Sequence, residues 1–486
     1  MVKEMMPPNI NNKVVSATKW SAITEIAAKL VSPISTMVLA RLLTPEAFGV
    51  LVTATMVISF AEIFTDAGFQ KYIIQHKFKN DEELYKSTDV AFWSNLIFSL
   101  IVWSGISLFA NEIAHLVGND GYGVVIAISC ICIPLEAFSS IQMALFKRKM
   151  DFKTLFVVRI IGIAVPLVVT IPLAFMTHSY WSLIIGMIAL NICNAVLLTV
   201  KSSWKPHWFY NFELFRDMFS FTVWSMFEAI SIWLTGYMDV FIVGTMFNTY
   251  YMGIYRTSIS LVGSIMALIT SSTTPVLFSA LSKLQDNDDG FKRMFFKFQK
   301  LVGIVVMPLG VGLFLFRDIV TNFLLGSQWT EASYFVGWMG LTSALMIVFS
   351  HYCSELFRAK GKPQYSVMSQ MIHLSIMVPT VYISAKYGFE MLCLSRALVR
   401  LTGIISAFAF LYMIVHITPL DMVSNMVHPI FATTVMFFLY KLLPMTDSMV
   451  VSIIYAILCA LIYTITICMF REERNILRNI KTMFNK

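Results

Sequence analysis

The chain has 486 residues, of which 57% are hydrophobic and 13% are charged. Soluble domains carry about 25% charged and about 45–50% apolar residues, so this composition excludes a multidomain soluble enzyme and indicates a chain surrounded mainly by lipid. Its 36 Lys and Arg exceed its 28 Asp and Glu. Because apolar stretches separate the basic residues, the excess favours an anionic membrane surface as partner and not a nucleic acid.

Apolar stretches follow one another along the whole chain. A helix of about 20 residues crosses the ~30 Å hydrocarbon core of a bilayer. The sequence predicts about 14 such helices, at residues 15–40, 48–68, 87–109, 122–144, 156–176, 180–200, 221–243, 253–278, 300–320, 333–357, 366–385, 391–413, 427–443 and 448–470. Backbone groups in lipid must hydrogen-bond within their own segment, and the sequence lacks the short alternating strands of a barrel. We therefore expect an all-α integral membrane protein.

The basic residues mark one side of the membrane. The loop after the fourth predicted helix is typical of that side, with Lys147, Arg148, Lys149 and Lys153. The loops of the other side hold only Arg41, Arg317, Lys386 and Lys441. Since cytoplasmic loops carry the excess of Lys and Arg, we expect both termini in the cytoplasm.

The sequence also repeats weakly. An offset of 204 residues aligns Thr18, Trp20, Ser21 and Gly49 with Thr222, Trp224, Ser225 and Gly253. Both segments begin on the same side of the membrane, so predicted helices 1–6 match helices 7–12 in parallel. In transporters built from such repeats, the substrate site lies at the interface between the repeats. We predict an N-terminal six-helix lobe (1–210), a C-terminal six-helix lobe (211–416), and helices 13–14 with a cytoplasmic tail (417–486).

Cations within the predicted spans are the first candidate site residues. Each costs about 2.5–3.5 kcal/mol at mid-bilayer, so each needs a reason. Lys29 either neutralises Glu25 one turn away or lies beside a wet cavity. Arg256, Arg396 and Arg400 either extend to the headgroups or face a lumen, and Arg396 and Arg400 share a helical face. If they face one cavity, their guanidinium groups suit phosphate oxygens.

Carboxylates within the spans form a second candidate set. Glu62 and Glu228 lie deepest, where a carboxylate can bind H⁺ or Na⁺ and couple its gradient to movement. The alternative is a counter-ion to an arginine, which we also consider for Glu136. The sequence has no HExxH, phosphate-loop or GxSxG motif, and its seven cysteines lie in apolar stretches. We expect no enzyme activity, no metal and no cofactor other than a coupling ion.

Several blocks of residues resemble one family. They are Lys19-Trp20-Ser21-Ala22-Ile23, the run from Val38 to Gly49 (VLARLLTPEAFG), Asp66-Ala67-Gly68-Phe69 and Pro275-Val276-Leu277-Phe278. These blocks resemble the Wzx-type polysaccharide flippases of the multidrug/oligosaccharidyl-lipid/polysaccharide export superfamily, especially its colanic-acid-exporter-like branch.

The resemblance implies two six-helix lobes with two peripheral helices, and transport by alternating access. It implies a bacterial inner-membrane protein that moves undecaprenyl-diphosphate-linked oligosaccharides to the periplasmic leaflet for O-antigen, capsule or exopolysaccharide assembly, beside a polymerase and chain-length machinery. Lys29, Arg256, Arg396 and Arg400 would then receive the diphosphate. One alternative is a drug or cation exporter of the same superfamily, which would prefer an acidic or aromatic cavity. Another is a membrane glycosyltransferase or polysaccharide polymerase, whose large external loop or acidic motif the sequence lacks.

Overall fold

The computed structural model describes residues 20, 28, 31–66, 68–444, 446 and 448–476. For residue 66, residues 220–225, 227 and 228 it describes the backbone alone. Every regular element in these ranges is a helix. The contacts divide the chain into two compact units, Met1–Gly253 and Ile254–Lys486, and the division falls inside α12 (Thr249–Ser282). The lobe boundaries expected from the repeat stay a prediction.

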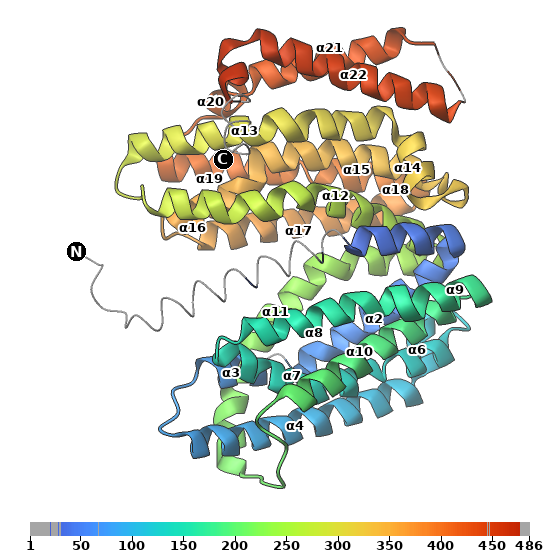
Figure 1. Cartoon of the computed structure of the whole chain (residues 1–486), viewed down its shortest axis with the longest axis vertical. Coiled ribbons are helices and arrows are strands. Elements are labelled where there is room, and N and C mark those ends of the chain that lie inside the picture. Colours follow the sequence, from blue (N-terminus) through green and yellow to red (C-terminus); the bar gives the residue numbers. More distant parts are fainter. Residues whose placement is uncertain are drawn as a thin grey trace. The chain divides into compact units, whose positions relative to one another are not determined.

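The first unit is built from long and short helices joined by short connections (Figure 1). They are α2 (Pro45–Asp66), α3 (Phe69–Gln75), α4 (Asp81–Leu108), α5 (Ala110–Leu116), α6 (Gly123–Ser129), α7 (Cys132–Arg148), α8 (Phe152–Val165), the π-helix η1 (Pro166–Thr170), α9 (Ile171–Thr177), α10 (Trp181–Lys201) and α11 (Phe212–Met246). Helix α2 packs against α4, α7 and α11. It therefore lies at the centre of the unit.

The second unit has the same character. Its helices are most of α12, then α13 (Asp288–Leu315), α14 (Arg317–Leu325), the 3-10 helix η2 (Ser327–Trp329), α15 (Ala332–Met346), the π-helix η3 (Ile347–His351), α16 (Tyr352–Ala359), α17 (Gln364–Ala385), α18 (Phe389–Val399), α19 (Thr402–Val415), α20 (Pro419–Ser424), α21 (Val427–Leu442) and α22 (Met449–Met469). Helix α15 packs against α13 on one side and α18 on another.

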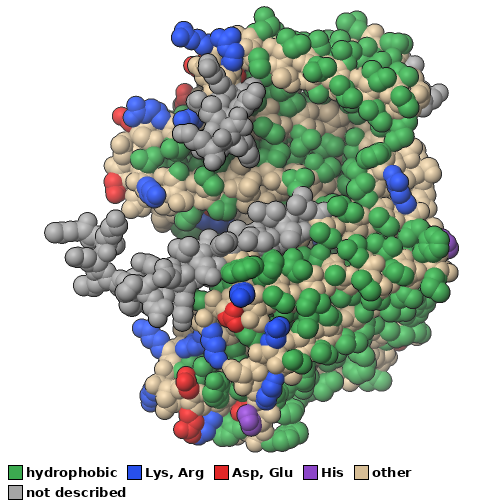
Figure 2. Space-filling model, viewed as in Figure 1, with side chains coloured by type: hydrophobic (Ala, Val, Ile, Leu, Met, Phe, Trp, Pro, Cys, Tyr) green, Lys and Arg blue, Asp and Glu red, His purple; other side chains and the backbone are tan. Residues whose placement is uncertain are grey.

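The predicted spans are confirmed. Among the described residues, 12 helices are long and apolar enough to cross a membrane, and two shorter apolar helices are Val31–Leu42 and Val427–Leu442. Thirteen of the predicted spans overlap one of these helices, and the span predicted at 15–40 lies largely outside the described residues, where only its end falls on Val31–Leu42. Figure 2 shows hydrophobic side chains over large parts of the visible described surface, with the charged side chains mainly toward the left of the view. The chain is a multi-pass membrane protein.

Several spans change their hydrogen-bond pattern midway. Pro166 has no N–H, so α8 cannot continue unchanged, and the π-helical turn η1 separates it from α9. A second π-helical turn, η3, separates α15 from α16 without a proline. A third span breaks where α18 ends at Val399 and α19 starts at Thr402. This break places Arg400 in a turn within the span.

Helix α2 and the first turn of α12 meet backbone to backbone. A Cβ atom on Gly49 would overlap the carbonyl of Thr249, and a Cβ atom on Gly253 would overlap the carbonyl of Pro45. Only glycine allows two helices to approach this closely. Beside the contact, the buried side chain of Asn119 donates to Thr53 Oγ1 at 2.7 Å and accepts from Thr249. The start of α12 is thus fixed within the first unit.

The last two helices attach to α13 through charged groups near their ends. Lys300 Nζ lies 2.6 Å from Glu472 and 3.6 Å from Glu473, whose side chain is fully buried. His428 Nδ1 lies 2.8 Å from the same Glu473 carboxylate. The hydrogen bond and charge of Lys300 lower the pKa of Glu472 below its ordinary value. An ion pair with Lys300 and a hydrogen-bond contact with His428 therefore hold the segment after α22 to α13 and α21.

Candidate functional site

The predicted arginines of the second unit lie on helices that flank α15. Arg400, in the turn between α18 and α19, donates to Ser343 Oγ at 2.7 Å and to Met339 Sδ at 3.7 Å, both on α15. Arg396 lies one turn earlier on the same side, and both side chains are half-buried. The break between α18 and α19 explains how a guanidinium group reaches a polar partner from within a span.

Arg256 reaches the neighbourhood of α15 from another helix. It is half-buried on α12, where the preceding ring of Tyr255 stacks on Phe335 of α15 with centroids 5.1 Å apart. Helices α12 and α18 thus both pack on α15. The assignment of Arg256, Arg396 and Arg400 to a substrate site stays a prediction, and so does their binding of a common ligand.

Two predicted site residues cannot be placed. Lys29 lies outside the described residues, and only the backbone of Glu228 is described, within α11. The remaining carboxylate of the predicted set, Glu62, is half-buried on α2.

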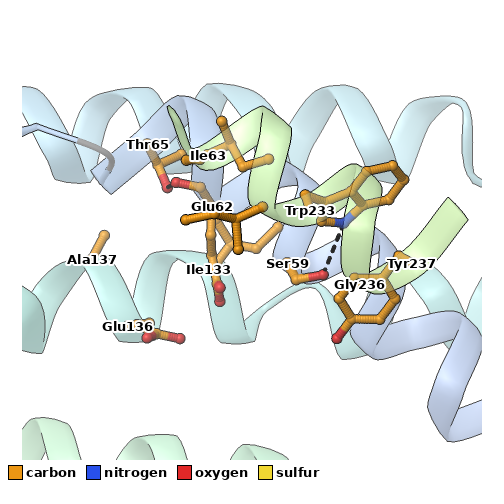
Figure 3. A pocket seen from close by; sticks show the side chains of 12 residues that line it. Ser59, Glu62, Ile63, Thr65, Ile133, Glu136, Ala137, Trp233, Gly236 and Tyr237 are labelled. Carbon is orange, nitrogen blue, oxygen red and sulfur yellow. Dashed lines mark hydrogen bonds between the residues drawn. The ribbon is translucent and has the colours of Figure 1, made fainter. Parts of the chain in front are cut away.

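Glu62 lines a cavity of about 390 Å³ inside the first unit. Three helices contribute its polar and aromatic side chains: Ser59 and Glu62 from α2, Glu136 from α7, and Trp233 and Tyr237 from α11. Figure 3 shows these side chains converging on one space, with the indole N–H of Trp233 directed at the hydroxyl of Ser59. We call this space the Glu62 cavity.

Helical spacing explains why these residues meet. Ser59 and Glu62 are three residues apart on α2, and Trp233 and Tyr237 are four apart on α11, so each pair lies on one helix face. The Trp233 indole donates to Ser59 Oγ at 3.1 Å, which joins the two faces. The rings of Trp233 and Tyr237 stack with centroids 5.7 Å apart and planes inclined by 22°.

An apolar groove of about 460 Å³ adjoins the Glu62 cavity in the same unit. It is lined by Met56, Val57, Phe60, Ala61, Phe64, Val102, Ile106, Ile113, Leu116, Val117, Trp233, Met238 and Phe241. Trp233 lines both spaces, so its ring lies between the Glu62 cavity, which contains carboxylates, and the wholly apolar groove. Phe60, Phe64 and Leu116 are exposed at this groove, as expected of side chains that meet lipid.

The structure therefore adds residues that the sequence did not single out. The sequence predicts Glu136 only as a possible counter-ion, and it gives Ser59, Trp233 and Tyr237 no role. The signals were present: a carboxylate inside a span, and two aromatic residues four apart on α11. Among the described residues, no three His, Cys, Asp or Glu side chains are grouped as a metal centre requires.

The fold is that of a multi-pass membrane protein with polar groups inside its spanning helices. Residues 38–334, more than half of the chain, match the family described as polysaccharide biosynthesis protein, and the chain belongs to this family. The family resemblance seen in the sequence blocks is confirmed.

Relatives and a solved structure agree with this family. The chain is 21% identical to the succinoglycan biosynthesis transport protein ExoT of Rhizobium meliloti (strain 1021), over 75% of this chain and 72% of that protein. It is 19% identical to the lipopolysaccharide biosynthesis protein WzxC of Escherichia coli (strain K12), over 78% of this chain and 76% of that protein. Its fold is similar to the lipid II flippase MurJ in an inward closed conformation, with a TM-score of 0.72, 14% identity, and coverage of 94% of this chain and 99% of that one.

Proposed function

We propose that the chain carries lipid-linked oligosaccharides across the membrane for polysaccharide assembly. The observation that carries this proposal is the family match over residues 38–334 on the fold that MurJ also has. The names of ExoT and WzxC associate relatives with succinoglycan transport and lipopolysaccharide biosynthesis. The substrate class is an undecaprenyl-diphosphate-linked oligosaccharide, moved by alternating access from the cytoplasmic to the outer leaflet without chemical change.

Arginines of the second unit suit the diphosphate. A guanidinium group has five N–H donors in a planar fork that matches phosphate oxygens. Arg400 uses its Nη1 group on Ser343 and Met339, which orients the fork. We assign the diphosphate to Arg400, Arg396 and Arg256, with Lys29 as a further cation.

Carboxylates of the first unit suit coupling to an ion gradient. Glu62 lies in a cavity within the spans, where protonation or Na⁺ binding would remove the cost of a charge in a low-dielectric site. We assign H⁺ or Na⁺ coupling to Glu62 and Glu228.

The cellular setting follows from the same proposal. The protein resides in the bacterial inner membrane with both termini in the cytoplasm, because the basic residues favour that side. A polymerase and chain-length machinery would use the transported units.

A deletion strain tests the function. Loss of the gene should remove surface polysaccharide and leave lipid-linked oligosaccharide on the cytoplasmic face, where an added membrane-impermeant glycosidase cannot reach it in intact spheroplasts. Purified protein in liposomes should move the same lipid between leaflets. Normal polysaccharide in the deletion strain, together with no movement in liposomes, would contradict the proposal.

One observation favours a second function, export of organic cations. The Glu62 cavity is acidic and aromatic, which suits a cationic drug. Ethidium efflux from cells with and without the gene separates the two functions. Efflux that depends on the gene, with unchanged polysaccharide, would favour the exporter.

A further inference from the structure

The Glu62 cavity has a chemistry that differs from the arginines of the second unit. Its polar groups are two carboxylates, hydroxyl groups and the edge of an indole ring, and the described residues that line it include no Lys or Arg. An ionised carboxylate is an acceptor only, so it repels phosphate and attracts groups that donate hydrogen bonds. The cavity therefore does not suit the diphosphate of a lipid-linked substrate.

Trp233 and Tyr237 form a rigid aromatic surface beside these acceptors. Their rings stack on each other, and Phe60 packs on Trp233 with centroids 4.8 Å apart. The hydrogen bond from the Trp233 indole N–H to Ser59 fixes which edge of the indole ring faces α2. A ligand would meet a preformed surface, which lowers the entropy lost on binding.

This geometry favours a sugar ring over an organic cation. Aromatic cages bind cations by placing several ring faces around the charge, whereas the stacked rings of Trp233 and Tyr237 present a single aromatic wall to the cavity. A sugar needs one aromatic surface, because its C–H groups carry partial positive charge and pack on the negative face of an aromatic ring. It also needs hydrogen-bond acceptors around its own edge, where its hydroxyl groups lie. Glu62 and Glu136 supply such acceptors.

The size of the cavity is compatible with this ligand. Small-molecule sites usually have volumes of roughly 300–1,000 Å³ and combine apolar surface with a few polar groups that fix orientation. The Glu62 cavity has about 390 Å³, and Ile63, Ile133 and Ala137 complete its lining.

We propose that the Glu62 cavity binds the saccharide part of the transported lipid. Trp233 and Tyr237 provide the surface for a sugar ring, and Glu62 and Glu136 accept hydrogen bonds from its hydroxyl groups. This inference rests on the proposed function and adds a saccharide subsite in the first unit. Specificity for the glycan is therefore determined by the first unit.

Binding to two probes tests the subsite. The probes are farnesyl diphosphate, which has no sugar, and the polyprenyl-diphosphate oligosaccharide extracted from the strain that carries the gene. Trp233→Ala should weaken binding of the oligosaccharide probe to the purified full chain by about tenfold, since it removes the stacking surface, while binding of farnesyl diphosphate changes less than about twofold. Glu136→Gln, which keeps the shape and removes the charge, should act in the same direction.

Trp103→Ala is the matched control. Trp103 also donates its indole N–H across helices, to the carbonyl of Ala127 at 3.0 Å, but does not line the Glu62 cavity. It should leave both affinities unchanged. Trp233→Phe keeps an aromatic ring and should retain most of the affinity, which provides a folded variant if the alanine variant is unstable.

The remaining outcomes separate the subsite from the function. If wild-type protein binds and moves the oligosaccharide lipid but Trp233→Ala and Glu136→Gln bind both probes normally, the subsite is wrong and the function stands. Equal weakening for both probes would assign Trp233 a structural role and also overturn the subsite. If wild-type protein binds tetraphenylphosphonium and Trp233→Ala loses only that binding, the cavity is a cation site. If wild-type protein binds neither lipid probe, the proposed function fails.

Discussion

At the scale of single residues, the hydrogen-bond partners of Arg400 differ from those expected of an arginine that extends to the lipid headgroups. An arginine that only extends to headgroups needs no partner inside the span. Arg400 instead lies in a helix break and donates to Ser343 on the adjacent α15. The hydrogen bond orients the guanidinium group, and orientation is what a bidentate contact with phosphate needs.

Substitution of Arg400 tests this role. Arg400→Ala should abolish surface polysaccharide with a normal protein level, because the fork is lost. Arg400→Lys keeps the charge without the fork and should restore only part of the polysaccharide. Immunoblots and polysaccharide staining measure the two quantities, and exposed Arg471, replaced by Ala, is the control. Normal polysaccharide in Arg400→Ala would remove Arg400 from the substrate site.

At the scale of helices, close packing depends on a few glycines. Gly49 and Gly253 allow α2 and α12 to meet backbone to backbone, and Asn119 joins the contact through Thr53 and Thr249. Interiors are packed too densely to accept an added methyl group at such a point without a shift of the helices.

Gly49→Ala should therefore destabilise the protein. Overpacking costs about 1–3 kcal/mol, which should appear as a lower midpoint of thermal unfolding in detergent. Gly105→Ala in α4 is the matched control, since a Cβ atom there has no neighbour within 4 Å. The control should match or exceed wild-type stability, because alanine favours the helix by up to about 1 kcal/mol. Equal midpoints for both variants would contradict the packing described for α2 and α12.

The positions of the helices could be predicted from the sequence, because the hydropathy of a membrane span is set by consecutive residues. The predicted span at residues 391–413, for example, corresponds to Phe389–Val415. Its break at Arg400 was not predicted, since the stretch has no proline or glycine before Gly403. The Glu62 cavity was not predicted as a whole, because a hydropathy profile does not show which helices pack together, although Glu62 and Glu136 are visible as carboxylates inside spans. The meeting of Trp233 with Ser59 and Glu136 depends on how α2, α7 and α11 pack.

At the scale of the whole molecule, charge distribution determines orientation in the membrane. The basic residues of the sequence lie mainly in loops that alternate spans would place on one side. Translocation of such loops is disfavoured, so the chain should insert with them in the cytoplasm. The proposed direction of transport, from the cytoplasmic to the outer leaflet, depends on this orientation.

Single-cysteine labelling tests the orientation. A cysteine at Ser203, in the connection after α10, should react with a membrane-impermeant maleimide only after cells are opened. A cysteine at Asp120, an exposed residue between α5 and α6, should react in intact cells. The seven native cysteines are buried or half-buried and are replaced by Ala or Ser in the background. The reverse pattern would contradict the orientation and the assigned direction of transport.

The contact at Gly49 has a consequence for the repeat in the sequence. Positions 45 and 49 correspond to positions 249 and 253 under the 204-residue offset, and each glycine lies on the carbonyl contributed by the partner position. Reciprocal pairing of this kind is the mark of an isologous interface, in which a surface meets an identical copy of itself. The pairing agrees with the 204-residue repeat expected from the sequence, because each of the two repeated segments makes the same contact on the other.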